Sequence, residues 1–131
     1  MSTSESFARL SERVCREQGW ELLAGGVRVP IVGGRSQLVD IERYDLDQRE
    51  RLRLFTRIGP FETLGVIRME VALRKNASLE RGAFAIRDEQ LVMTETFAVD
   101  EVKSDEFEAA VRFLAETADG YEKWIYGTDE N

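Results

Sequence analysis

The sequence contains no histidine among its 131 residues. Histidine is the commonest general base near neutral pH and the commonest protein ligand for transition metals. Its absence removes every pairing of a nucleophile with a histidine base and the usual zinc-binding sets. An enzyme would have to perform its acid–base chemistry with carboxylates, lysines or Tyr44, and no spacing here indicates such a site. We therefore expect a protein that is not an enzyme and that uses no cofactor and no metal.

Cysteine is almost absent as well, and long apolar runs are missing. The single cysteine, Cys15, can form no internal disulfide, which argues against a secreted, disulfide-stapled scaffold. It lies beside the apolar stripe of its helix with no histidine to activate it, so we interpret it as a buried structural thiol. No run approaches the roughly 18 apolar residues of a transmembrane helix, and the first residues lack the pattern of a signal peptide. These absences predict a cytoplasmic protein without a membrane partner.

The sequence has fewer basic than acidic residues, 18 against 25, which gives a net charge of −7. Such a protein repels phosphate backbones at long range, so we expect no nucleic-acid partner. Neither Gly25-Gly26 nor Gly33-Gly34 is followed by the Lys-Ser or Lys-Thr of a phosphate-binding loop, and both pairs are interpreted as turns. The acids of Asp45-Leu46-Asp47 lack the further ligands and the glycine of a calcium loop, so this segment is interpreted as a solvated turn.

What the sequence does contain is a regular succession of helical and strand-like patterns, over a length typical of one domain, residues 1–131. Apolar residues at helical spacing predict three helices, from Ser2 to Gly19, from Leu64 to Asn76, and from Ser104 onward. Alternating patterns predict one strand over Trp20 to Ile31, a hairpin over Gln37 to Ile58, and a second hairpin over Ala83 to Val99. The order α-β-β-β-α-β-β-α favours an α+β fold, an antiparallel sheet with its helices packed mainly on one face.

The hairpin from Gln37 to Ile58 is the clearest of these segments. A turn centred between Asp47 and Gln48 divides its side chains into two faces. One face is apolar and is predicted to belong to the core: Val39, Ile41, Leu52, Leu54 and Ile58. The other face is mixed and carries Leu38, Asp40, Glu42, Tyr44, Arg51, Arg53, Phe55 and Arg57.

The mixed face permits two interpretations. In the first, Glu42 and Asp40 pair across the strands with the arginines, and the face neutralises itself. In the second, the face is a contact surface, because apolar side chains combined with arginine are typical of protein interfaces. The candidate partner-binding residues are Leu38, Tyr44, Arg51, Arg53, Phe55 and Arg57.

The last helix presents two apolar rows. Its main stripe consists of Phe107, Val111, Leu114, Ala118, Tyr121 and Ile125. A neighbouring row consists of Ala110, Phe113, Thr117, Tyr121 and Trp124. The second row is explained either by broad packing within the domain or by contact with a subunit or partner.

A run of positions from the second helix onward resembles a known family. It comprises Leu73-Arg74-Lys75-Asn76 at a helix end, Gly82-Ala83-Phe84-Ala85-Ile86, Asp88, Leu91-Val92-Met93, and a final helix with Phe107, Phe113, Leu114 and Tyr121. In these positions and in its order of elements, the chain resembles the bacterial type III secretion chaperone-like proteins, including the YbjN group of sensory-transduction regulators. The resemblance implies an acidic homodimer that holds an extended or partly unfolded client segment. It places the dimer interface on the second helix, with the candidates Leu64, Ile67, Val71 and Leu73.

Two functional hypotheses follow. The first is a non-catalytic protein-binding module, chaperone-like or an adaptor, that holds a segment of a client or regulatory protein. The alternative is a domain of the YbjN type that senses a small ligand or signal. Client binding predicts an exposed apolar face, whereas ligand sensing predicts a closed pocket with a few converging polar groups.

Overall fold

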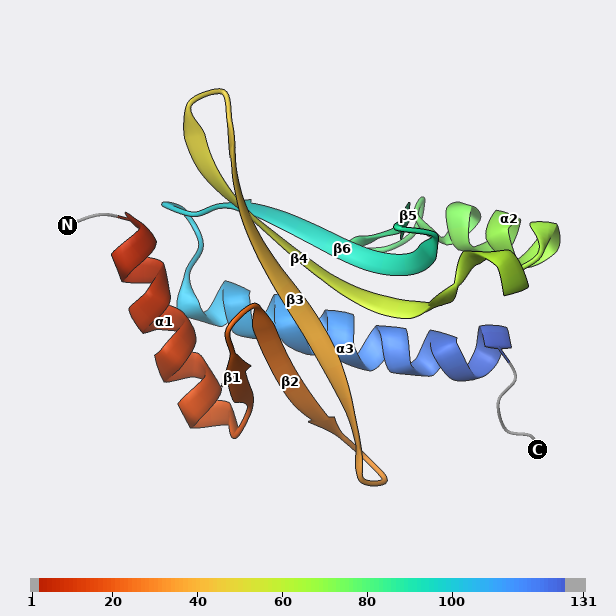
Figure 1. Ribbon diagram of the computed structural model, residues 1–131, viewed down its shortest axis with the longest axis horizontal. Coiled ribbons are helices and arrows are strands. Elements are labelled where there is room, and N and C mark those ends of the chain that lie inside the picture. Colours follow the sequence, from red (N-terminus) through yellow and green to blue (C-terminus); the bar gives the residue numbers. More distant parts are fainter. Residues whose placement is uncertain (1–2, 127–131) are drawn as a thin grey trace.

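The computed structural model describes residues 3–126 and contains one antiparallel sheet of six strands (Figure 1). The helices are α1 (Thr3–Gln18), α2 (Val66–Lys75) and α3 (Ser104–Tyr126), with a short 3₁₀ helix, η1 (Phe61–Thr63). The strands are β1 (Glu21–Leu23), β2 (Gly26–Ile31), β3 (Arg35–Leu46), β4 (Arg49–Pro60), β5 (Ala83–Arg87) and β6 (Gln90–Ala98). Their order in the sheet is β1-β2-β3-β4-β6-β5. The predicted α+β fold with an antiparallel sheet is confirmed.

The prediction of a single strand over Trp20 to Ile31 is wrong, because this segment forms the hairpin β1–β2. Leu23 pairs with Gly26, which leaves Ala24 and Gly25 as a two-residue turn. The alternating residues Val27, Val29 and Ile31 all lie in β2, and β1 has only three residues, which are too few to show an alternation of their own. Gly26 is required at its position, since a Cβ atom there would lie 2.5 Å from the carbonyl oxygen of Val39.

The two longer hairpins turn where the sequence predicts. In β3–β4, Leu46 pairs with Arg49 around Asp47 and Gln48, whose φ angles are 55° and 63°. In β5–β6, the turn residues Asp88 and Glu89 have φ angles of 51° and 61°. Two successive left-handed residues are the geometry of the two-residue turn that matches the twist of antiparallel strands. This geometry sets the register of both hairpins.

The core lies between one face of the sheet and the helices α1 and α3 (Figure 1). The ring of Phe7 on α1 meets that of Phe107 on α3 edge to face, with 5.4 Å between centroids. Cys15 is buried as predicted, and burial raises the pKa of its thiol. The predicted core residues of β3 and β4 are buried, apart from the half-buried Ile41: Val39, Leu52, Leu54 and Ile58.

The main stripe of α3 is confirmed at the positions whose side chains the structure describes. Phe107, Val111, Leu114 and Ala118 are fully buried, and Tyr121 is half-buried. In the second row, Ala110 is buried while Phe113 and Thr117 are half-buried, so broad packing within the monomer accounts for much of this row. The predictions for Trp124 and Ile125 concern side chains outside the described part of the chain.

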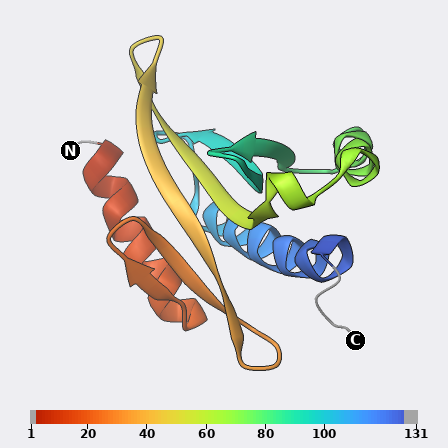
Figure 2. The same ribbon diagram turned by 45° about the vertical axis from the view of Figure 1, so that its right-hand side comes forward.

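Helix α2 lies apart from α1, at the end of the sheet next to β5 (Figures 1 and 2). It begins at Val66, two residues later than predicted, because Gly65 has a φ angle of 83° and interrupts the chain after η1. Leu64 therefore precedes the helix, and its side chain is buried in the core. The helix ends at Lys75 with Asn76 as its C-terminal cap, where the sequence predicts its end.

Candidate functional site

The face of the sheet opposite α1 and α3, called here the outer face, collects the mixed side chains of the β3–β4 hairpin. Asp40 pairs with Phe55, Glu42 with Arg53, and Tyr44 with Arg51. The pairing of β4 with β6 and of β6 with β5 extends the same face to further residues. These are Val92, Thr94 and Thr96 on β6, and Ala83, Ala85 and Arg87 on β5. The structure thus brings all the candidate partner-binding residues onto one face.

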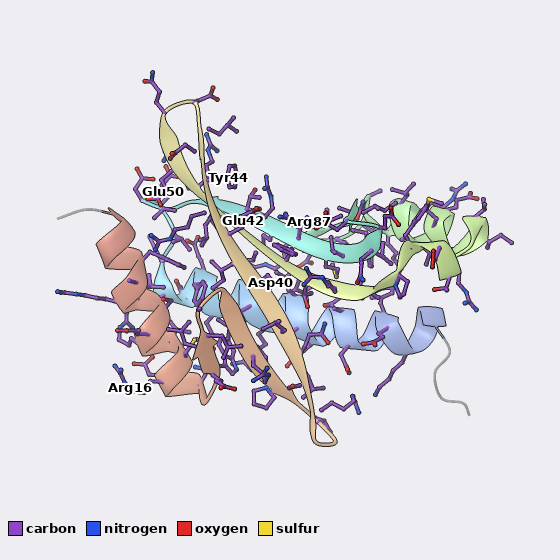
Figure 3. All side chains as sticks on the ribbon, in the orientation of Figure 1. Arg16, Asp40, Glu42, Tyr44, Glu50 and Arg87 are labelled. Carbon is purple, nitrogen blue, oxygen red and sulfur yellow. The ribbon has the colours of Figure 1, made fainter. Side chains whose placement is uncertain are left out.

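The carboxylate of Glu42 is the centre of the outer face (Figure 3). Arg87 donates to it twice, from Nη1 to Oε1 at 3.0 Å and from Nη2 to Oε2 at 2.9 Å, and Arg53 Nη1 donates to Oε1 at 3.0 Å. The hydrogen bonds from Arg87 and then from Arg53 lower the pKa of Glu42 to about 2. A second pair joins Arg57 Nη1 to Asp40 Oδ2 at 2.7 Å. The cross-strand pairs of the first interpretation are therefore present.

Aromatic rings lie directly beneath these guanidinium groups. The guanidinium carbon of Arg53 is 4.2 Å from the ring centroid of Tyr44, and that of Arg87 is 4.1 Å from the centroid of Phe55. Guanidinium groups stacked this closely on rings gain cation–π attraction. Phe55 is only 7% exposed, so it forms the floor of the face and offers little open surface. Leu38 is 38% exposed and remains accessible.

Arg87 is a residue of this cluster that the sequence did not reveal. It lies 45 positions after Glu42 and reaches the carboxylate on β3 from the edge strand β5, across β4 and β6. The alternation of β5 places Arg87 on the same face as Ala83 and Ala85, but only the strand order shows that this face continues from β4. No local signal in the sequence would have identified it.

A pocket of about 200 Å³ lies on the outer face between Arg53 and Arg87. Phe55 and Val92 are among its apolar lining residues, and Ala85 contributes a small side chain from β5. Next to this cluster along β4, Arg51 forms no ion pair with any described residue, and its buried Nε has no hydrogen-bond partner. The outer face therefore carries one arginine that no described carboxylate neutralises.

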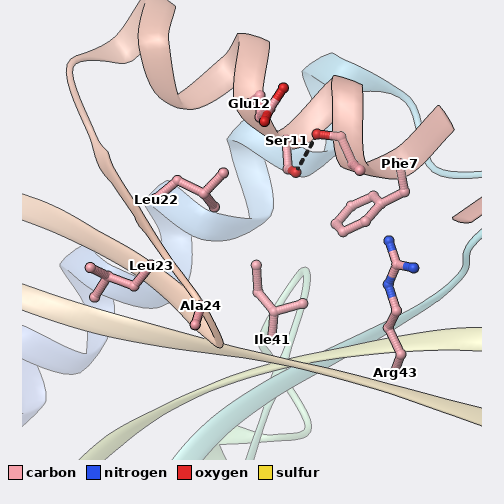
Figure 4. A pocket seen from close by; sticks show the side chains of 10 residues that line it. Phe7, Ser11, Glu12, Leu22, Leu23, Ala24, Ile41 and Arg43 are labelled. Atoms are coloured by element: carbon pink, nitrogen blue, oxygen red, sulfur yellow. Dashed lines mark hydrogen bonds between the residues drawn. The ribbon is translucent and has the colours of Figure 1, made fainter. Parts of the chain in front are cut away.

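A second cavity, of about 400 Å³, lies between α1 and the strands β1 to β3 (Figure 4). Phe7, Leu22 and Ile41 give it apolar walls. Its polar groups include Ser11, whose hydroxyl donates to the carbonyl of Ala8 at 3.0 Å. Arg43 lies over the ring of Phe7, with its guanidinium carbon 5.0 Å from the ring centroid. This cavity is large enough for a small ligand, since ligand pockets measure about 300–1,000 Å³.

The surface of α2 is the third candidate. Val66 and Ile67 are both 77% exposed and Leu73 is 60% exposed, while Val71 is half-buried. Leu64, the remaining candidate for the dimer interface, is 2% exposed and therefore has no surface free for a second chain. These exposed apolar side chains make α2 a candidate contact surface.

Two further findings concern the described residues. Within residues 3–126, no group of three or more Asp, Glu or Cys side chains is arranged to hold a metal ion. In the same part of the chain, no helix is both long and apolar enough to span a membrane.

Comparison with known proteins identifies the fold. No protein-family model matches the sequence, and no curated protein sequence matches it either. Among solved structures, a chain of the ExsC–ExsE complex matches with a TM-score of 0.68 and 16% identity, over 95% of this chain and 97% of the other. A chain of the HopA1–SchA chaperone–effector complex matches with a TM-score of 0.62 and 12% identity, over 94% and 98% of the two chains. For the Yersinia pestis type III secretion chaperone SycH bound to a fragment of YscM2, the TM-score is 0.57 and the identity 17%, over 86% and 96%.

These matches span nearly the whole of each chain, so the chain has the fold of the type III secretion chaperones, as its resemblance to that family predicts. YbjN from E. coli also matches, with a TM-score of 0.48 and 14% identity over 88% of this chain and 87% of YbjN.

Proposed function

The protein's fold is that of chaperones that hold other proteins, and from this premise we propose that it is a non-catalytic protein-binding module. It acts as a chaperone-like protein or adaptor that holds a segment of a client or regulatory protein. The observation that carries the proposal is the outer face, where apolar side chains and arginines lie together on the side of the sheet opposite α1 and α3. This combination is the one that protein interfaces favour.

The proposed partner site consists of the six predicted residues of the β3–β4 hairpin. Leu38 and Tyr44 supply apolar contact, and Phe55 supports the arginines from beneath. The guanidinium groups supply directed hydrogen bonds to the partner. Their residues are Arg51, Arg53 and Arg57.

The proposed assembly is a homodimer formed through α2. The proposal is supported by the exposure of two predicted interface residues, Ile67 and Leu73. Val66, which the sequence did not indicate, is exposed beside them. Val71 lies at the edge of this surface, next to a hollow of about 520 Å³ between α2 and α3. Burying such side chains against a second copy removes apolar surface from water at about 25 cal/mol per Å². We place the assembly in the bacterial cytoplasm, where the lone Cys15 remains reduced.

Co-purification tests this function. The tagged protein is isolated from its native host after mild cross-linking, and bound proteins are identified by mass spectrometry. A specific protein partner is expected, and its recovery should fall about tenfold with Leu38→Asp or Tyr44→Ala, because contact residues carry about 1–3 kcal/mol. Leu46→Asp, at the 50% exposed tip of the same hairpin, is the matched control and should retain the partner. Recovery that is equal for all four proteins would contradict the proposed site.

The cavity beside α1 supports the second candidate, a small-ligand sensor. Its volume of about 400 Å³ and its mixture of apolar walls with Ser11 and Arg43 fit a small organic molecule. Native mass spectrometry of the protein from its host distinguishes the two functions. A retained small molecule that is lost with Ile41→Trp would support sensing, whereas a protein of unmodified mass that carries only a protein segment would contradict it.

A further inference from the structure

We infer that the outer-face pocket between Arg53 and Arg87 receives an acidic side chain, glutamate or aspartate, from the partner segment. The inference rests on the proposed protein-binding function and specifies the partner's chemistry. The pocket's volume of about 200 Å³ is below the range of about 300–1,000 Å³ for small-molecule sites. Its size therefore suits one side chain better than a cofactor.

The charge of the outer face selects the sign of that side chain. Around the pocket the outer face carries four arginines, Arg51, Arg53, Arg57 and Arg87, against the two carboxylates of Asp40 and Glu42. Farther along the face, Arg28 is paired with Glu21, and Arg49 with Asp100 and Glu101. A third carboxylate, that of Asp88 in the adjacent turn, lies 3.9 Å from Arg87 Nε. The four arginines around the pocket still outnumber these three carboxylates. This excess stands on a chain whose net charge is −7, so the outer face is a local site for an anion on an otherwise acidic protein.

Glu42 demonstrates that these arginines bind a carboxylate. Its two oxygens accept hydrogen bonds of 2.9–3.0 Å from the charged guanidinium groups of Arg87 and Arg53, and hydrogen bonds between charged groups are stronger than neutral ones. Arg53 uses only Nη1 in these bonds, so its other N–H groups stay available within the described structure. A second carboxylate at the pocket mouth can accept from them.

The floor of the pocket suits the rest of an acidic side chain. Phe55, Val92 and Ala85 present apolar atoms to the methylene groups, and the Thr94 side chain lies beside them. An apolar floor also excludes water, and hydrogen bonds between charged groups strengthen where water is excluded. The pocket therefore matches an aliphatic stem that ends in a carboxylate.

Three synthetic peptides provide the test. Each has ten residues and a fluorescent label, and alternates threonine with glutamate, glutamine or lysine. Binding to the full-length protein is followed by fluorescence anisotropy at low salt. The glutamate peptide should bind about tenfold more tightly than the glutamine peptide, since a charge-assisted hydrogen bond is stronger than a neutral one. The lysine peptide measures non-specific attraction to the net charge of −7. The preference should shrink as salt is added.

Two variants locate the binding. Ala85→Leu fills the pocket and keeps every arginine, and Arg53→Lys keeps the charge but removes the fork of N–H donors. Each should weaken binding of the glutamate peptide about tenfold. Arg74→Lys is the matched control, because it makes the same substitution as Arg53→Lys at a side chain on α2 that is 77% exposed, and it should have no effect. Their circular-dichroism spectra should match that of the wild type.

Equal affinity for the glutamate and glutamine peptides, or failure of Ala85→Leu to weaken binding, would overturn the inference. Absence of binding by all three peptides would overturn it too. None of these results affects the co-purification of a protein partner through Leu38 and Tyr44. The co-purification experiment therefore tests the proposed function independently of the pocket.

Discussion

The side-chain amide of Asn76 is hydrogen-bonded to both backbone polar groups of Phe84. The amide oxygen accepts from the Phe84 N–H at 2.7 Å, and the amide nitrogen donates to the Phe84 carbonyl at 3.2 Å. Asn76 is the C-terminal cap of α2 and Phe84 belongs to β5, so one side chain joins the helix to the edge of the sheet. This link fastens the C-terminal end of α2 to β5.

Replacement of Asn76 by alanine should destabilise the protein by about 1–3 kcal/mol, because the backbone groups of Phe84 lose their partners in a half-buried setting. Urea unfolding followed by tryptophan fluorescence measures the change. Asn76→Asp keeps an acceptor for the Phe84 N–H and loses the donor, so its loss should be smaller. Wild-type stability in Asn76→Ala would show that the link contributes nothing.

Ile67→Asp should convert the proposed homodimer to a monomer. A charge at a buried subunit contact must lose its hydration, whereas Ile67 is 77% exposed in the single chain and its replacement leaves the monomer intact. Light scattering coupled to gel filtration measures the mass. Val32→Asp is the matched control, because Val32 is 90% exposed but lies in the β2–β3 turn, far along the chain from α2. A wild-type protein that runs as a 15.0 kDa monomer at micromolar concentration would rule out the proposed dimer.

Phe55→Ala and Tyr44→Ala should differ sharply in their effect on stability. Phe55 is 7% exposed beneath Arg87, so its truncation should cost about 3–5 kcal/mol, as for a buried aromatic side chain. Tyr44 is only half-buried under Arg53, and its truncation should cost about 1 kcal/mol. Urea unfolding of both variants measures the two losses of unfolding free energy. Equal losses would contradict the assignment of Phe55 as the floor of the outer face.

The ion pairs of Glu42 should make stability depend on pH in the acidic range. The arginines lower the pKa of Glu42 from 4.5 to about 2 in the folded protein, so the folded state favours the charged carboxylate. The resulting stabilisation is fully present above pH 4.5 and is lost as the pH falls toward 2. The difference in unfolding free energy between wild type and Glu42→Gln should therefore be constant above about pH 5.5 and shrink below it.

Urea titrations at a series of pH values from 7 to 2 measure that difference. Asp119, whose pKa is lowered chiefly by its hydrogen bonds with Arg35, is present in both proteins and cancels. A difference that does not change with pH would show that Glu42 gains nothing from its arginines.

The sequence by itself determined the features that repeat locally. The period of two in β3 and β4 assigned Val39 and Leu54 to the core and Tyr44 and Arg53 to the opposite face, since a strand alternates its side chains whatever surrounds it. The helical period of α3 likewise identified Phe107 and Leu114 as buried. Such patterns need no knowledge of the neighbouring elements, because each element must bury its own apolar side.

Only the tertiary structure decided which of these faces adjoin. The insertion of β6 between β4 and β5 continues the outer face from Arg53 to Arg87, although the two residues are far apart in the chain. The same holds for Leu64, which follows the helical period of α2 but lies in the core because Gly65 turns the chain after it. Strand order and chain reversals arise from contacts between distant segments, and the periodicity within a segment carries no record of them.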